Sequence, residues 1–313
     1  MKKLPPPKRG TRTPALQELD RFSTADLQRW QTASEQLDEL NAALYFGTEP
    51  ERRRIRHKLI AALKGAPVHV HAFENWTRSV TYEHSLQPLS SAGSLTDIGG
   101  RFNTGYELDE GTLNPWPALY LAQDLETAYR EKFGLASTDR VDGLTGEELA
   151  LEGRVSHSNV VLHGRIERVF EMTNFTSLNS VGRVLGKVKM PRQAETLKKE
   201  LKIAASELTM VKNGEQLFNL VTKMNWRVNP RQFGLPAQSQ ILADLIRAAG
   251  FEAILYQSSK GPGKCLAIFP DKLTGGSYVE MSHRAAHAST TTRLDTTTAP
   301  DLEGWDVVPR NRR

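Results

Sequence analysis

Arginine, tyrosine and glutamate follow one another at short spacings between positions 98 and 131, and together these side chains can hold an anion and stabilise a cation. Arg101 comes directly after the pair Gly99-Gly100, which allows a tight turn where a side chain would clash. Tyr120 stands in a short apolar run, and Glu131 follows eleven positions later. These three residues are the first candidates for a site.

The pattern around them predicts a loop, a strand and a helix as supports. The run 118–122 is apolar and bounded by Pro117 and Asp124, which is typical of a short buried strand. From Asp124 to Phe133 the pattern is helical, and Gly134 stands where a C′ glycine would end the helix. We therefore expect the loop arginine, the strand tyrosine and the helix glutamate to converge on one cleft.

A second apolar region, far downstream, contains two adjacent serines. Its pattern predicts a helix over 237–249 and strands over 251–256 and 265–269. Ser258 and Ser259 follow the first of these strands, and alternation along it would point them to opposite faces, so only one is expected to face the cleft. Neither lies in a G-x-S-x-G elbow, so neither is predicted to be a hydrolase nucleophile.

This set of residue types suits the cleavage of a glycosidic bond to a cationic leaving group. In NAD, nicotinamide leaves ribose through an oxocarbenium-like state whose positive charge a fixed carboxylate can stabilise. Arginines pair bidentately with a pyrophosphate, tyrosine offers nicotinamide a flat partner, and serine can orient the ribose or the glutamate. No Rossmann G-x-G-x-x-G is present to suggest a doubly wound dinucleotide fold.

The same segments resemble the RES-domain family, which is named for its Arg, Glu and Ser. The resemblance covers roughly residues 68–281 and is carried by Gly99–Asn103 with Gly105, Ala118–Ala122, Ala128-x-x-Glu131, Ala248–Ser259 and Cys265–Phe269. It implies an α+β (mixed α/β), ADP-ribosyltransferase-like fold that consumes NAD or transfers from it. It further implies a bacterial toxin that is neutralised by an antitoxin with a helix-turn-helix domain.

The resemblance implies a role for each candidate in binding NAD. Arg78 and Arg101 would bind the phosphates, and Tyr120 would flank the nicotinamide. Many relatives carry an aromatic residue directly after the first arginine, where this chain has Ser79, and Tyr82 is the candidate substitute. NAD is thus expected as the substrate.

The resemblance also implies the catalytic set. Glu131 would be catalytic together with Arg101, and one of Ser258 and Ser259 would complete the site. The family pattern slightly favours Ser259, but because the serines are adjacent the register stays open.

A metal is not expected in this site. His69 and His71 alternate on one face of a strand predicted over 68–72, but no carboxylate or cysteine cluster with ligand spacing completes a metal site. The single cysteine, Cys265, excludes an internal disulfide and fits a reducing cytoplasm. No apolar run approaches the roughly 18 residues of a membrane span, so we expect a cytoplasmic protein without a membrane contact.

The chain is expected to hold one catalytic domain with extensions at both ends. Helical periodicity predicts two helices before residue 66, the second starting at Thr48–Glu51, and one long helical region over about 192–224. The expected parts are a disordered basic arm (1–14), a helical extension (15–66), an RES-like NAD-binding catalytic domain (67–284) and a disordered tail (285–313).

Three functions stay open at this stage. The first is a growth-inhibiting toxin that cleaves NAD by phosphorolysis or hydrolysis, and the second is a mono-ADP-ribosyltransferase that modifies a protein. The third belongs to another class, a non-catalytic module whose basic arm and helices bind nucleic acid or protein. For the toxin, nucleic acid would be contacted only indirectly, and the N-terminal helices could form a homodimer.

Overall fold

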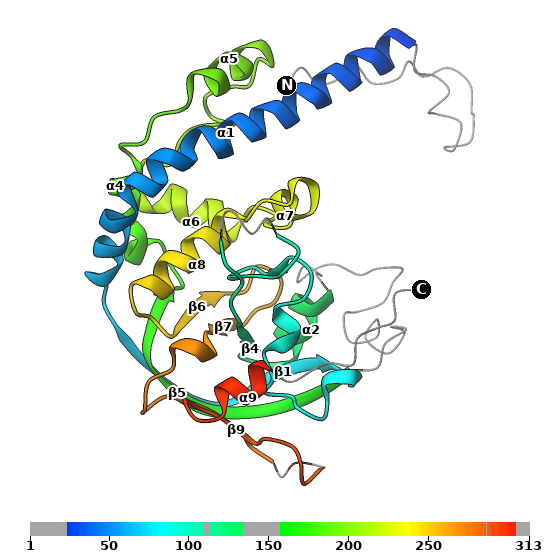
Figure 1. Ribbon diagram of the computed structural model, residues 1–313, viewed down its shortest axis with the longest axis vertical. Coiled ribbons are helices and arrows are strands. Elements are labelled where there is room, and N and C mark those ends of the chain that lie inside the picture. The colour runs from blue at the N-terminus through cyan, green and yellow to red at the C-terminus, as the bar shows by residue number, and fades with distance from the viewer. Residues whose placement is uncertain (1–23, 109–112, 134–156, 284, 286, 305–313) are drawn as a thin grey trace. The chain divides into compact units, whose positions relative to one another are not determined.

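The structure, a computed structural model, describes residues 24–108, 113–133, 157–283, 285 and 287–304 (Figure 1). The chain divides into two compact units, one of Met1–His57 with Val184–Lys212 and one of Lys58–Arg183 with Asn213–Arg313. This division differs from the predicted one in two respects: its first boundary follows His57 and not residue 66, and Val184–Lys212 groups with the N-terminal region. The predicted arm 1–14 lies outside the described residues.

Helices and strands occur together in the pattern of an α+β fold, with a helix ahead of the first strand, as predicted. The described α-helices are α1 (Thr24–Lys64), α2 (Leu125–Phe133), α4 (Asn179–Leu185), α5 (Arg192–Glu200), α6 (Gly214–Thr222), α7 (Val228–Phe233), α8 (Gln238–Ala248) and α9 (Ala299–Glu303). Short 3-10 helices are η2 (Tyr82–His84), η3 (Ala92–Ser94), η4 (Thr176–Leu178) and η5 (Pro270–Lys272). Within the described part, no helix combines the length and the apolar content that a membrane crossing requires.

The first unit is built from α1 residues up to His57 and from α5, which share a small apolar core. Leu40, Ala43, Ala194 and Leu197 are its buried members. The two helices predicted before residue 66 are a single helix, α1, with Pro50 inside it. Thr48 does not start a helix but belongs to one, and its hydroxyl donates to the carbonyl oxygen of Leu44 at 2.7 Å.

The long helical region predicted over 192–224 is also wrong, because it is two helices that belong to different units. After α5 the backbone of Lys202 takes a left-handed φ of 55°, which ends the helical path. Asn213 then starts α6, since its side-chain oxygen accepts from the Gln216 amide at 2.9 Å. This is the N-cap arrangement that asparagine favours.

The second unit is organised by a seven-stranded mixed sheet in the order β1-β4-β7-β6-β5-β8-β9. β1 also pairs with β5, so the pairings of β1, β4, β7, β6 and β5 close on themselves. Only the β5–β6 pairing is parallel among the described ladders. The strands are β1 (His69–Thr81), β4 (Leu119–Ala122), β5 (His157–Met172), β6 (Ala253–Gln257), β7 (Lys264–Ile268), β8 (Tyr278–Met281) and β9 (Arg293–Leu294), with a separate hairpin of β2 (Gly99–Gly100) and β3 (Asn103–Thr104).

The strand predicted over 68–72 is the first part of a longer strand, β1, which contains a bulge. Phe73 pairs with Gly164 and Trp76 with Leu162, so β1 has one residue more than β5 in this interval. Asn75, at φ 58°, lies inside the bulge. Residues three apart normally point to opposite faces, and the extra residue lets Phe73 and Trp76 both enter the core.

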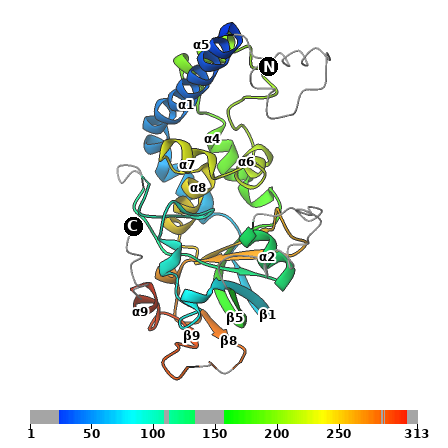
Figure 2. The ribbon, with the colours of Figure 1, turned by 90° about the vertical axis from the view of Figure 1, so that its right-hand side faces the viewer.

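The core of the second unit is formed mainly by side chains from the strands of this sheet. The remaining predicted elements are confirmed: the strand around Tyr120 is β4, the helix around Glu131 is α2, and 237–249 corresponds to α8 followed by Gly250 at φ 92°. In both ribbon views α2 lies beside β1 and β4 (Figures 1 and 2). The main core members are Phe73, Trp76, Leu89, Leu119, Leu121, Leu162, Ile166, Val169, Leu255, Leu266 and Ile268.

The tail predicted to be disordered is folded over residues 287–304. β9 adds to the edge of the sheet through β8, and α9 follows it. Leu294 and Leu302 are buried in the same core, and the Leu302 carbonyl accepts from Ser90 Oγ at 2.6 Å. Composition misleads here because a few apolar residues among many threonines are enough to dock a short segment on an existing core.

Candidate active site

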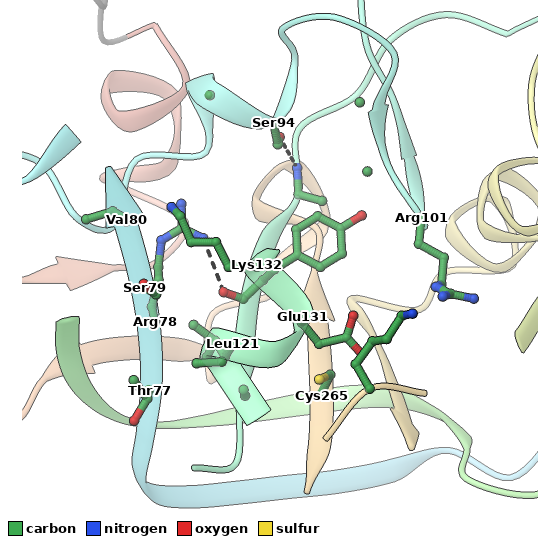
Figure 3. Close-up of a pocket in the computed structure, with 18 of the residues that line it drawn as sticks. Thr77, Arg78, Ser79, Val80, Ser94, Arg101, Leu121, Glu131, Lys132 and Cys265 are labelled. Carbon is green, nitrogen blue, oxygen red and sulfur yellow. Dashed lines mark hydrogen bonds between the residues drawn. The ribbon is translucent and has the colours of Figure 1, made fainter. Parts of the chain in front are cut away.

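A cavity of about 420 Å³ opens in the second unit between β1, β4, α2, the β2–β3 hairpin and the segment joining α6 to α7 (Figure 3). Its described lining carries five basic side chains and one carboxylate, Glu131. In Figure 3 the side chains of Arg101 and Glu131 extend into the same part of the cavity, and Arg78 lies on its β1 side. The basic lining residues are Arg78, Arg101, Lys132, Arg227 and Lys260.

The hairpin that carries Arg101 requires its glycines and is held by a buried glutamine. Gly99 has φ 80°, and a Cβ on Gly100 would lie 2.5 Å from the Tyr120 hydroxyl oxygen. Gln240 of α8 is fully buried, and its Nε2 donates to the carbonyl oxygens of Ile98 (3.0 Å), Gly100 (3.0 Å) and Asn103 (2.8 Å). The hairpin is thereby fixed to α8.

Arg101 extends from this hairpin to the end of α6. Its Nη1 donates to the carbonyl oxygens of Val221 (3.2 Å) and Thr222 (3.0 Å), where the helix dipole leaves partial negative charge. Its Nη2 donates to Ser259 Oγ at 3.3 Å. The guanidinium predicted to bind phosphate is thus positioned at the cavity by protein oxygens that carry no full charge.

Arg78 lies on β1 and also contacts three backbone carbonyls. Its guanidinium donates to the oxygens of Pro88 (2.8 Å), Ser90 (2.9 Å) and Tyr120 (3.2 Å). Burial lowers the pKa of Arg78 to about 10, and within the described chain no carboxylate forms an ion pair with it. Arg78 therefore ties the 88–90 segment to β4 and leaves positive charge at the cavity wall.

Tyr120 lines the cavity, and its hydroxyl is held by two hydrogen bonds to the β2–β3 hairpin. The hydroxyl accepts from the Phe102 amide at 2.9 Å and donates to Asn103 Oδ1 at 2.9 Å. Burial raises the pKa of Tyr120, so the phenol stays neutral. Tyr82, the other aromatic candidate, lies in η2 with 69% of its surface exposed and is not among the lining residues, so the structure does not bring it into the cavity.

Glu131 accepts a short hydrogen bond from Ser258. The Ser258 Oγ donates to Glu131 Oε1 at 2.6 Å and itself accepts from the amides of Lys260 (3.0 Å) and Gly261 (2.8 Å). Donors that point at a hydroxyl oxygen polarise it and strengthen the bond that it donates. Ser258, which the Lys260 and Gly261 amides hold in place, therefore fixes the position of the Glu131 carboxylate.

Strand alternation does not apply to the two serines, and neither is among the described lining residues of the cavity. β6 ends at Gln257, so Ser258 and Ser259 lie in the following turn and do not alternate across a strand. Ser258 is buried and contacts Glu131, whereas Ser259 contacts Arg101. Each serine thereby supports a different candidate residue.

The glycine-rich turn after the serines packs against the first turn of α2. A Cβ on Gly263 would lie 2.2 Å from Asp124 Oδ2, and one on Gly261 would lie 2.7 Å from Thr127 Cα. The Gly263 amide donates to Thr127 Oγ1 at 2.9 Å, and the Thr127 amide donates to Asp124 Oδ1 at 2.7 Å. This packing sets the distance between Ser258 and the helix that carries Glu131.

Several lining residues were not predicted from the sequence. Trp226 and Arg227 stand in the turn before α7, and Arg227 Cζ lies 4.7 Å from the centre of the Trp226 ring. Tyr256 packs edge-on to Phe102 at 4.8 Å, and burial raises the pKa of the Cys265 thiol beside it. Among the described residues, no group of three or more His, Cys, Asp or Glu could hold a metal ion.

Fold and site together define an α+β protein with a basic cavity arranged around one carboxylate. Residues 183–290 match the model of the RES domain, which confirms the resemblance over that range. The range contains both serines, and Arg78, Arg101, Tyr120 and Glu131 precede it. A search of curated proteins finds no match.

A search of solved structures finds the M. tuberculosis MbcT–MbcA toxin–antitoxin complex. The match has 13% identity and a TM-score of 0.39, and it covers 79% of this chain and 97% of that chain.

Proposed function

We propose that this chain cleaves the nicotinamide–ribose bond of NAD. The observation that carries the proposal is the Glu131–Ser258 hydrogen bond of 2.6 Å at the wall of a cavity whose other charged lining residues are basic. The match of residues 183–290 to the RES domain, a family whose members act on NAD, supports it.

The charges of the cavity fit the charges of NAD. The pyrophosphate is an anion that arginine and lysine bind, and arginine does so bidentately. The nicotinamide end is cationic, and a single carboxylate among the described lining residues suits it. The neutral ring of Tyr120 offers the nicotinamide a flat surface to stack on.

The bond between the anomeric carbon and the nicotinamide nitrogen then breaks heterolytically. The electron pair stays with nicotinamide, which leaves neutral, and the positive charge moves to the ribose as an oxocarbenium-like state. Glu131 stabilises that charge from a position that Ser258 fixes before the reaction, which is electrostatic preorganisation. Phosphate or water completes the reaction by forming the new bond to the anomeric carbon.

We further infer a role as a growth-inhibiting toxin that acts by depleting NAD. The RES resemblance supports this role and implies a helix-turn-helix antitoxin as the partner that neutralises it.

Induced expression in bacterial cells tests the proposal, with growth and the NAD pool followed together. The wild-type chain is expected to arrest growth as NAD falls, and Glu131→Gln to do neither. Glu126→Gln is the matched control, because Glu126 lies on the same helix, pairs with Arg130 and is not a lining residue. Growth arrest with an unchanged NAD pool, or equal arrest by Glu131→Gln, would contradict the proposal. ADP-ribose found attached to cell proteins would show that a protein side chain, rather than phosphate or water, is the acceptor.

A further inference from the structure

Arg227 differs from the other cavity arginines in how its guanidinium is used. Arg78 and Arg101 donate to backbone carbonyls, whereas the guanidinium of Arg227 makes no hydrogen bond or ion pair with any described residue. It lies at the cavity, exposed to solvent, at the N-cap position of α7. Its N–H donors are therefore available to a ligand.

Two positive charges and one negative charge act on one another here. The pKa of Arg227 is lowered by partial burial and next by the positive charge of Arg101, while the negative charge of Glu131 acts in the opposite direction. Arg101 and Arg227 thus repel each other at the cavity wall. An anion that contacts both guanidinium groups would relieve this repulsion, which favours a ligand with more than one negative charge.

Trp226 holds the Arg227 side chain in place without using its donors. The guanidinium carbon lies 4.7 Å from the centre of the indole ring, within the range of a cation–π contact. A stacked guanidinium keeps its N–H groups at the edge of the plane, and little rotamer entropy remains to be lost when an anion binds.

We propose that Arg227, stacked on Trp226, binds the pyrophosphate together with Arg101 and makes the cavity selective for ligands that carry a pyrophosphate. This inference rests on the proposed function, since it names the part of NAD that this residue recognises. The segments that carry the sequence resemblance to the RES-domain family do not include either residue of this pair, which lies in the turn between α6 and α7.

Isothermal titration with ADP-ribose and with adenosine tests the inference without any need for turnover. Arg227→Gln loses a charged hydrogen-bonding group, so its affinity for ADP-ribose should be about tenfold to a hundredfold lower than that of the wild type. Its affinity for adenosine should not change. Arg165→Gln is the matched control, because Arg165 lies on β5 and is not a lining residue of the cavity. Within the described chain its ion pair is with Glu167, at 4.0 Å. It should bind both ligands as the wild type does.

Equal ADP-ribose affinity of Arg227→Gln and the wild type would overturn the inference, as would an equal loss for adenosine. Lack of ADP-ribose binding by the wild type would overturn it as well. If ADP-ribose binds in an Arg227-dependent manner but NAD is not cleaved, the proposed function fails and the anion site stands. Because the side chain of Arg227 makes no described hydrogen bond, thermal melts of the variant should match the wild type and exclude misfolding.

Discussion

The hydroxyl oxygen of Tyr120 fills the space that a side chain on Gly100 would need. A Cβ at position 100 would lie 2.5 Å from that oxygen and 2.7 Å from Asn103 Oδ1. The hydroxyl in turn holds the Phe102 amide, so the glycine pair, the loop arginine and the strand tyrosine form one interlocked unit. This contact explains why a glycine precedes Arg101.

Gly100→Ala should displace Tyr120 and weaken both fold and activity. We expect a loss of about 1–3 kcal/mol in the free energy of unfolding, because the new methyl group meets a side chain that is itself hydrogen-bonded. Urea unfolding and nicotinamide release measure the two effects. Gly275→Ala is the control, since nothing lies within 4 Å of a Cβ there. Wild-type values for Gly100→Ala would contradict the interlocked unit.

Ser258 and Ser259 should differ in their effect on catalysis. Ser258→Ala removes the hydrogen bond to Glu131, and we expect kcat to fall about tenfold to a hundredfold, with little change in KM. Ser259 is exposed and only contacts Arg101 at 3.3 Å, so Ser259→Ala should change kcat less than about threefold. Steady-state kinetics on NAD decides between them, and a larger loss for Ser259→Ala would reverse the assignment.

Stability should fall on the alkaline side of neutrality. Burial raises the pKa of Cys265 above its ordinary 9.0 and the pKa of both Tyr120 and Tyr256 above 10.0. The unfolded chain therefore loses these protons at a lower pH than the folded chain does. Above about pH 9 the folded state thus holds more protons than the unfolded state. The free energy of unfolding should then drop by up to about 1.4 kcal/mol per pH unit and per group.

Urea unfolding near pH 7 and near pH 10 measures this slope. Cys265→Ala removes the group that titrates first, so its stability should decline less between pH 9 and pH 10 than that of the wild type. Equal slopes for the two proteins would show that the thiol is not protected by burial.

Gln240→Leu should lower stability and activity although the residue does not line the cavity. The change leaves three carbonyl oxygens at the hairpin, at least two of them in buried hydrogen bonds, without their donor, at a cost of about 1–3 kcal/mol. We expect a lower melting temperature and a lower kcat for NAD cleavage. Gln238→Leu on the same helix is the control, because no described side-chain hydrogen bond of Gln238 reaches the hairpin. Unchanged kcat in Gln240→Leu would show that α8 does not position Arg101.

Periodicity predicted the elements that carry Tyr120 and Glu131, because a short apolar run and an amphipathic helix are local patterns. The contact of Ser258 with Glu131 required the resemblance, since it joins positions 127 residues apart. Strand alternation failed for the serines because the strand ends at Gln257 and both serines lie in the turn that follows, which the local composition does not reveal.

Other contributions had no signal in the sequence. Gln240 looks like a polar surface residue of a helix, and only the fold brings three carbonyl oxygens to it. Arg227 stands in a turn without periodicity, so nothing local separates it from the many solvated arginines. Leu294 and Leu302 are isolated in a threonine-rich segment, and their burial depends on a core built far upstream.

Nicotinamide release from NAD by the purified protein, with and without phosphate, tests the central claim most directly. The wild type and Glu126→Gln should release nicotinamide, and Glu131→Gln should lose about a hundredfold to a thousandfold of the rate, since it removes the charge that stabilises the transition state. Dependence on phosphate would identify the acceptor. Release by Glu131→Gln at the wild-type rate, or no release by the wild type under either condition, would contradict the assignment of this cavity as an NAD-cleaving site.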